Sequence, residues 1–81
     1  MKTTADLLHI GDKAIITHVD LDKIPLKLLE MGCFPNNELE VIQIAPFGDP
    51  MYLNINNGSH IAIRKETAHE IEVEIFSTNP K

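Results

Sequence analysis

The sequence lacks the features of a secreted or membrane-spanning protein. It has one cysteine, Cys33, so no disulfide can form within the chain. No basic segment followed by an apolar one stands at the N-terminus, and no apolar run approaches the roughly 20 residues that a membrane-spanning helix needs. We therefore expect a protein of the reducing cytoplasm that reaches a membrane only through a partner.

Basic residues and nucleotide-binding motifs are also scarce. Seven Lys and Arg residues stand against 12 Asp and Glu, and the net charge of −5 opposes binding to a nucleic-acid backbone. There is no Walker loop and no Gly-x-Gly-x-x-Gly, and Gly48 and Gly58 are isolated turn glycines. Glu72 and Glu74 alternate with apolar residues, and paired acids on such a strand face are typically solvated. The sequence contains no catalytic constellation, and we expect no enzyme.

The residues that are present favour a small β-rich core. The chain has 81 residues, of which 43% are hydrophobic, mostly Ile, Leu and Val, with no Trp and only three Phe. A chain of this length makes one domain. We expect a single domain over residues 1–81, with its core over about residues 4–75 and a flexible tail over residues 76–81.

Alternating and β-branched residues predict five short strands. They cover residues 13–19, 38–44, 51–55, 60–64 and 71–75. A change of phase at Ile42 indicates a bulge, and Asn57-Gly58 is typical of a primed hairpin turn. We expect Thr3 and Thr4 to cap a short helical turn, and residues 65–70 are long enough for another.

One helix is predicted after the first strand. Pro25 suits its first turn, Ile24, Leu28 and Met31 share an apolar face, and Gly32 suits a left-handed stop. Five strands with tight connections and one short helix predict a mainly β fold. We expect a small, partly closed SH3-like antiparallel barrel, with an OB-like barrel as the alternative.

The connection from Ala45 to Pro50 is the stiffest loop in the chain. Its two prolines fix the backbone and remove amide donors, and Gly48 takes conformations closed to other residues. Because strand-like runs flank it, we place it at the rim of the sheet. Two uses stay open: Phe47 packs on the barrel and Asp49 caps the turn, or both contact a partner.

Several segments of the chain, taken in order, resemble the FeoA family. They are Leu28-Leu29-Glu30-Met31-Gly32-Cys33-Phe34-Pro35, Leu39-Glu40-Val41, Ala45-Pro46-Phe47-Gly48-Asp49-Pro50, Ile61-Ala62-Ile63-Arg64-Lys65 and Ile71-Glu72-Val73. The likeness runs from about Thr4 to Glu74. Asn36 and Ile63 depart from the family's usual glycine and leucine, and both changes are physically mild.

The resemblance implies a non-enzymatic accessory or regulatory protein of bacterial ferrous iron uptake. Such a protein has no cofactor and binds the cytoplasmic GTPase part of FeoB, a membrane ferrous iron transporter. It is cytoplasmic and lies at the inner membrane only through this partner.

We expect the docking surface at the helix end and the rim loop, because proline-fixed loops on a rigid barrel lose little entropy on binding. The candidate partner-binding residues are Met31, Gly32, Phe34, Pro35, Pro46, Phe47, Gly48, Asp49, Pro50 and Arg64. Cys33, beside them, is expected to pack as a small apolar residue.

Two alternatives stay open. Histidines and surface acids that converge in space would give a weak transition-metal site; the histidines are His9, His18, His60 and His69. Arg64, the only arginine, would activate the transporter's GTPase if its guanidinium were supplied in trans.

Overall fold

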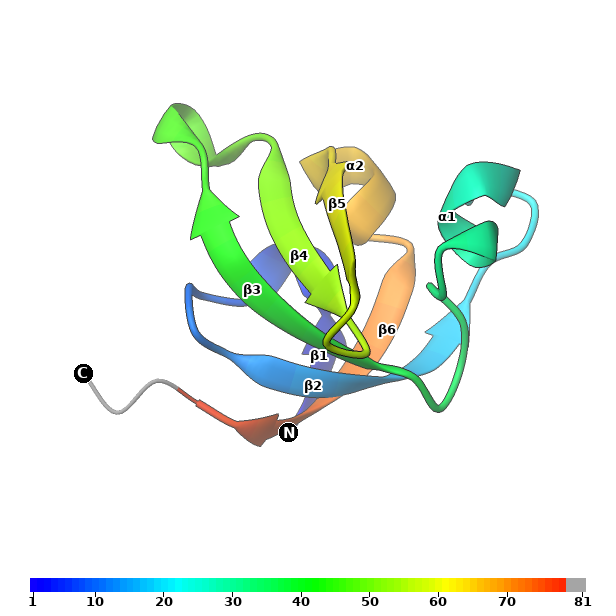
Figure 1. The fold of residues 1–81 in the computed structure, drawn as a ribbon, viewed down its shortest axis with the longest axis horizontal. Helices are drawn as coiled ribbons and strands as arrows, with labels where there is room; N and C mark the ends of the chain where they lie inside the picture. Colours follow the sequence, from blue (N-terminus) through cyan, green and yellow to red (C-terminus); the bar gives the residue numbers. More distant parts are fainter. Residues whose placement is uncertain (79–81) are drawn as a thin grey trace.

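The computed structural model describes residues 1–78, which form one six-stranded antiparallel sheet with two short α-helices and two 3₁₀ turns (Figure 1). The sheet order is β1-β6-β2-β3-β4-β5. The strands are β1 (Lys2–Thr4), β2 (Lys13–Val19), β3 (Glu38–Ile44), β4 (Met51–Ile55), β5 (Ser59–Ile63) and β6 (Ile71–Ser77). The helices are η1 (Ala5–Leu7), α1 (Leu26–Glu30), η2 (Pro46–Gly48) and α2 (Lys65–Ala68). The predicted mainly β, SH3-like fold is confirmed.

The core lies on the inner face of this curled sheet. Residues at every second position of β4, β5 and β6 are buried, as a half-buried strand requires; they include Met51, Leu53, Ile55, Ile61, Ile63, Ile71 and Val73. The register between β3 and β4 shifts between Val41 and Gln43, which confirms the predicted irregularity at Ile42. Ile42 and Gln43 are both exposed, so the bulge brings Ile44 back to the core side of the strand.

The N-terminal segment differs from the prediction. Lys2–Thr4 forms a strand that pairs with β6, so the sheet has six strands rather than five. Only then does the chain turn, through η1, and the Thr4 hydroxyl hydrogen-bonds the Asp6 carboxylate instead of capping a backbone amide. A three-residue strand carries too little alternation to be recognised, and its backbone partner lies about 70 residues away along the chain.

The turns use residues that tolerate positive φ. Gly32 ends α1 at φ 104° and Asn36 follows at φ 78°. In the β4–β5 hairpin the left-handed pair is Asn56 and Asn57, at φ 52° and 57°, one residue earlier than the predicted Asn57-Gly58. The Gly58 N–H instead closes the turn, donating to the carbonyl of Ile55 at 3.1 Å.

The sheet has two edges, β1 and β5, and helical segments lie beside each. On the β1 side, α2 packs against η1, and Nδ1 of His69 lies 3.3 Å from Oδ2 of Asp6. On the β5 side, α1 stands apart from the strand, to its right in Figure 1. Within residues 1–78, no helix is long and apolar enough to cross a membrane.

The C-terminal end of β6 lies beside the N-terminus of the chain. The Ile75 N–H donates to the carbonyl of Met1 at 3.0 Å. Residues 76 and 77, expected in a tail, belong to β6, and residues 79–81 of that expected tail lie outside the described part.

Candidate functional site

The end of α1 forms a rigid turn that presents an aromatic ring. The Cys33 N–H donates to the Leu28 carbonyl at 3.0 Å and the Gly32 N–H to the Leu29 carbonyl at 3.0 Å, the bonding pattern of a Schellman motif. The side chain of Asn37 donates to the Gly32 carbonyl at 2.8 Å. The helix therefore ends as predicted.

The candidate residues at this turn divide into packing and exposed side chains. Met31 is half-buried and packs against the core, whereas Phe34 is 46% exposed and Pro35 is exposed. Cys33 is fully buried, and burial raises the pKa of its thiol to about 11. Because a nucleophilic cysteine needs a depressed pKa, Cys33 is a packing residue, as expected.

The rim loop projects a second aromatic ring. The Gly48 N–H donates to the Ala45 carbonyl at 2.8 Å, and the Ala45 N–H donates to the Pro50 carbonyl at 3.0 Å, so the loop closes on itself. Phe47 stands at its tip with its side chain fully exposed, at 105%, and its backbone at φ 71°. Of the two uses left open for Phe47, packing on the barrel is therefore wrong.

Asp49 fixes this loop to the start of α2. Its Oδ1 accepts a hydrogen bond from the Lys65 backbone N–H at 3.1 Å, which satisfies one of the free amides at a helix N-terminus. The Lys65 side chain also runs alongside Gly48: its Nζ would lie 3.4 Å from a Cβ at that position. Asp49 thus caps a helix rather than its own turn, and it orients the Phe47 tip.

Arg64 lies directly before α2, and its carbonyl accepts the Ala68 N–H at 2.9 Å. Its side chain is exposed, and among the described residues no carboxylate comes within ion-pair distance of the guanidinium. The guanidinium is free to meet a ligand or partner.

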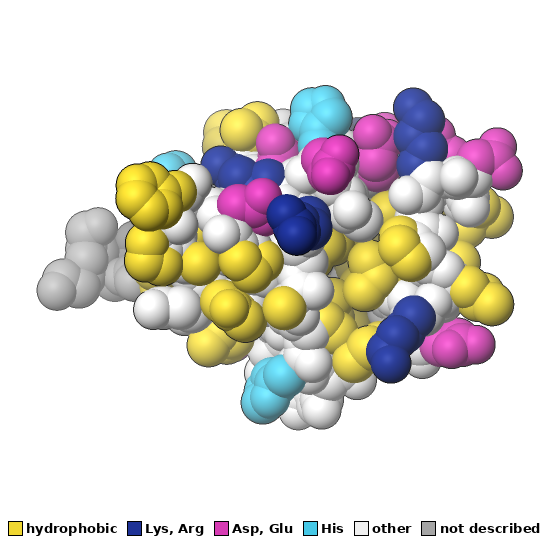
Figure 2. Space-filling view, turned by 90° about the horizontal axis from the view of Figure 1, so that it is seen from above, with side chains coloured by type: hydrophobic (Ala, Val, Ile, Leu, Met, Phe, Trp, Pro, Cys, Tyr) yellow, Lys and Arg dark blue, Asp and Glu magenta, His cyan; other side chains and the backbone are white. Residues whose placement is uncertain are grey.

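The two predicted docking segments do not form one contiguous site. In Figure 1 the end of α1 and the η2 loop stand on opposite sides of the upper face, with β5 and α2 between them. Seen from above, hydrophobic side chains spread over the middle of this face, and most acidic side chains lie along one edge (Figure 2). Arg64 belongs to the region between the two segments.

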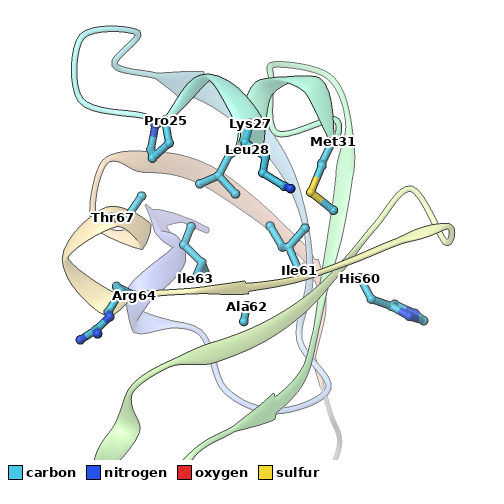
Figure 3. Close-up of a pocket in the computed structure, with 10 residues that line it drawn as sticks. All are labelled: Pro25, Lys27, Leu28, Met31, His60, Ile61, Ala62, Ile63, Arg64 and Thr67. Carbon is cyan, nitrogen blue, oxygen red and sulfur yellow. The ribbon is translucent and has the colours of Figure 1, made fainter.

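That region contains a groove of about 420 Å³ between α1 and β5 (Figure 3). Side chains of α1 stand over it, and those of Ile61 and Ile63 point up toward them. His60, Ala62 and Arg64 project from the opposite face of the strand. The lining residues are Pro25, Lys27, Leu28, Met31, His60, Ile61, Ala62, Ile63, Arg64 and Thr67. Apart from Met31 and Arg64, none of them is among the predicted partner-binding residues.

The histidines do not converge on a metal site. Among residues 1–78, no three His, Cys, Asp or Glu side chains lie close enough together to hold a metal ion. Asp12, only 5% exposed, is a buried carboxylate that the sequence did not single out. Its Oδ2 accepts the His9 backbone N–H at 2.8 Å, so its role is to hold the turn before β2.

Comparison with known families decides the identity of this fold. Residues 3–75 match the FeoA domain. The chain belongs to the FeoA family. The family is associated with ferrous iron transport and is non-enzymatic, which confirms the expectation that this FeoA domain is not an enzyme.

Similar proteins include a fusion protein and two FeoA structures. The chain is 40% identical over 73 residues to an Fe(2+) transport protein A/Fe(2+) transporter FeoB fusion protein of Porphyromonas gingivalis, covering 89% of this chain but 8% of that protein. It is 36% identical to the iron(II) transport protein A of Clostridium thermocellum, with a TM-score of 0.77, covering 90% of this chain and 45% of that one. The crystal structure of an iron uptake regulatory protein (FeoA) is 26% identical, with a TM-score of 0.79 and coverage of 94% and 99%.

Proposed function

We propose that this FeoA-family protein binds the cytoplasmic GTPase part of an FeoB-type ferrous iron transporter and regulates it without chemistry of its own. The observation that carries the proposal is the fusion relative, in which a sequence 40% identical to this one is joined to FeoB in one polypeptide. A domain that is covalently joined to its partner meets that partner at a high effective concentration. A separate protein makes the same contact by noncovalent binding.

The exposed aromatic rings supply contact residues for this binding. Phe34 and Phe47 are large apolar side chains on hydrogen-bonded turns, and aromatic side chains dominate the energy of many protein interfaces. Their turns lie on opposite sides of the upper face. The proposed contact surface therefore spans that face, and the proposal places the protein on the cytoplasmic side of the membrane through its partner.

A pull-down with the isolated cytoplasmic domain of FeoB tests the proposal, with and without guanine nucleotide. We expect retention of the protein, and a difference between the two nucleotide conditions if the effect works through the GTPase state. Phe34→Ala is expected to weaken binding, and Leu21→Ala is the matched control, since Leu21 is also an exposed apolar residue. The proposal would be refuted if the protein bound neither in the presence nor in the absence of guanine nucleotide.

A second candidate role is activation of the FeoB GTPase through Arg64. The supporting observation is that its guanidinium is exposed and unpaired within the described residues. An arginine supplied in trans accelerates GTP hydrolysis by about 10³-fold or more. Arg64→Ala and Arg64→Lys would then abolish stimulation while leaving binding intact. Stimulation that survives in Arg64→Ala excludes this role.

A further inference from the structure

The strand β5 is an edge of the sheet whose outer side is left without a strand partner. In the described residues its one neighbour in the sheet is β4, and no backbone hydrogen bond joins it to α1. The outward N–H and C=O groups of such an edge are a template for another strand, and natural proteins commonly cover them. The outer edge of β5 therefore presents backbone groups to which another strand could bind.

The groove between α1 and β5 follows this free edge. Its lining includes residues from both faces of β5, Ile61 and Ile63 from the inner face and Ala62 and Arg64 from the outer one, so the space wraps around the edge itself. A strand of five residues is about 17 Å long. An added segment of the same length would run along the part of β5 that lines the groove.

A second hollow continues the apolar surface past the edge. It has a volume of about 340 Å³, shares His60, Ile61 and Ala62 with the first groove, and is completed by Ile42 and Tyr52. Both of the latter side chains are more than 40% exposed. This hollow therefore lies next to the outward side chains of His60 and Ala62.

The charges around the first groove are of one sign. Its charged lining residues are Lys27 and Arg64, and no carboxylate lines it, although the whole chain carries a net charge of −5. In Figure 3 the Arg64 and His60 side chains lie on the outer face of β5, opposite to Ile61 and Ile63. This arrangement favours an occupant with apolar side chains on one face and carboxylates on the other.

We propose that β5 binds an extended segment of a partner protein as a seventh strand, a segment that alternates apolar and acidic residues. The apolar side chains enter the groove beneath α1, and the carboxylates lie beside Arg64 and His60. Backbone hydrogen bonds to the edge supply affinity, and the groove supplies selectivity. A second copy of this chain fits less well, because Ser59–Ile63 carries no carboxylate that could pair with Arg64 or Lys27.

Titration of the ¹⁵N-labelled protein with three synthetic peptides tests this proposal independently of FeoB. The probe is Ac-Val-Glu-Leu-Glu-Val-NH₂. One control carries Lys in place of Glu, and the other carries the acidic sequence with alternate backbone amides N-methylated, which removes strand hydrogen bonds. We expect the acidic peptide to shift the amide signals of Ser59 to Ile63, the Lys peptide to bind at least about tenfold more weakly, and the N-methylated peptide not to bind.

Charge-reversal variants provide the second arm. Arg64→Glu and, separately, His60→Glu are expected to weaken binding of the acidic peptide by about tenfold. Lys13→Glu, which changes an exposed cation on β2, is expected to leave binding unchanged. Equal binding of the acidic and basic peptides, full binding of the N-methylated one, or no shift at β5 would each overturn the proposal. So would shifts of the β5 amides with protein concentration alone, since the occupant would then be a second copy.

Discussion

Phe47 offers a way to separate the stability of the fold from its binding. Its side chain is fully exposed, so removing the ring gives up no buried area, while its backbone holds φ 71°, a conformation unfavourable for a residue with a Cβ. The substitution Phe47→Gly removes both the ring and the cause of the unfavourable conformation. Phe47→Ala removes the ring alone.

The two variants have different expected stabilities. The left-handed conformation costs an L-residue about 1–2 kcal/mol, and glycine avoids this cost. Glycine also gives the unfolded chain more freedom, which lowers stability by about 0.4–1 kcal/mol. Phe47→Gly is therefore expected to raise the free energy of unfolding by about 0.5–1 kcal/mol, whereas Phe47→Ala stays within about 0.5 kcal/mol of the parent.

Urea denaturation followed by far-ultraviolet circular dichroism measures this difference, with an unchanged slope against denaturant showing that the unfolded state is comparable. A glycine variant no more stable than the alanine variant would refute the reasoning about φ. In the pull-down with the FeoB cytoplasmic domain, both variants are expected to bind at least about tenfold more weakly, because both lack the ring. Undiminished binding by both would show that Phe47 makes no contact.

Three further predictions concern residues that hold the candidate surfaces in place. Gly32→Ala places a Cβ 3.0 Å from a buried isoleucine methyl at φ 104° and is expected to cost about 2–4 kcal/mol in thermal or urea unfolding. Gly58→Ala, whose Cβ would lie 3.8 Å from the Asn56 carbonyl oxygen in ordinary van der Waals contact, is expected to stay within about 0.5 kcal/mol. The folded pKa of Cys33, about 11, lies above the unperturbed value of 9.0, so the unfolded state loses its proton first. The free energy of unfolding is therefore expected to fall by about 2 kcal/mol as the pH rises from 9 to 11, and the Cys33→Ala variant, measured in parallel, lacks this component. Asp49→Ala removes the acceptor for the Lys65 N–H. It is expected to lower the free energy of unfolding by about 1 kcal/mol and to speed hydrogen exchange of the Lys65 amide. Unaltered exchange of that amide would contradict the capping role.

Much of the sheet was accessible from the sequence because one face of each longer strand is buried. The alternation of Ile61 and Ile63 with His60, Ala62 and Arg64 predicts β5, and a similar alternation predicts β4 and β6. Lys2–Thr4 carries no such pattern, because β1 is defined by backbone pairing with β6. The bulge at Ile42 was predictable because a slip of one residue changes the buried face of the strand.

The candidate site was only partly accessible. Pro46, Pro50 and Gly48 mark a stiff loop in the sequence, but the hydrogen bond that ties this loop to the start of α2 joins Asp49 to Lys65, 16 positions away. The groove was missed for a similar reason. The apolar face of α1 follows from its own periodicity, whereas the strand beneath it depends on the order in which the whole sheet is assembled.

The pairing of β1 with β6 determines how this small protein can be attached to anything else. Met1 lies beside the end of β6 at the bottom of Figure 1, while η2 and α1 stand in its upper part. A tag, surface linker or fused protein joined at Met1 therefore leaves from the side away from both aromatic tips and the groove. Immobilisation through that end leaves the upper face open to solution, so binding measured on a surface reports on that face.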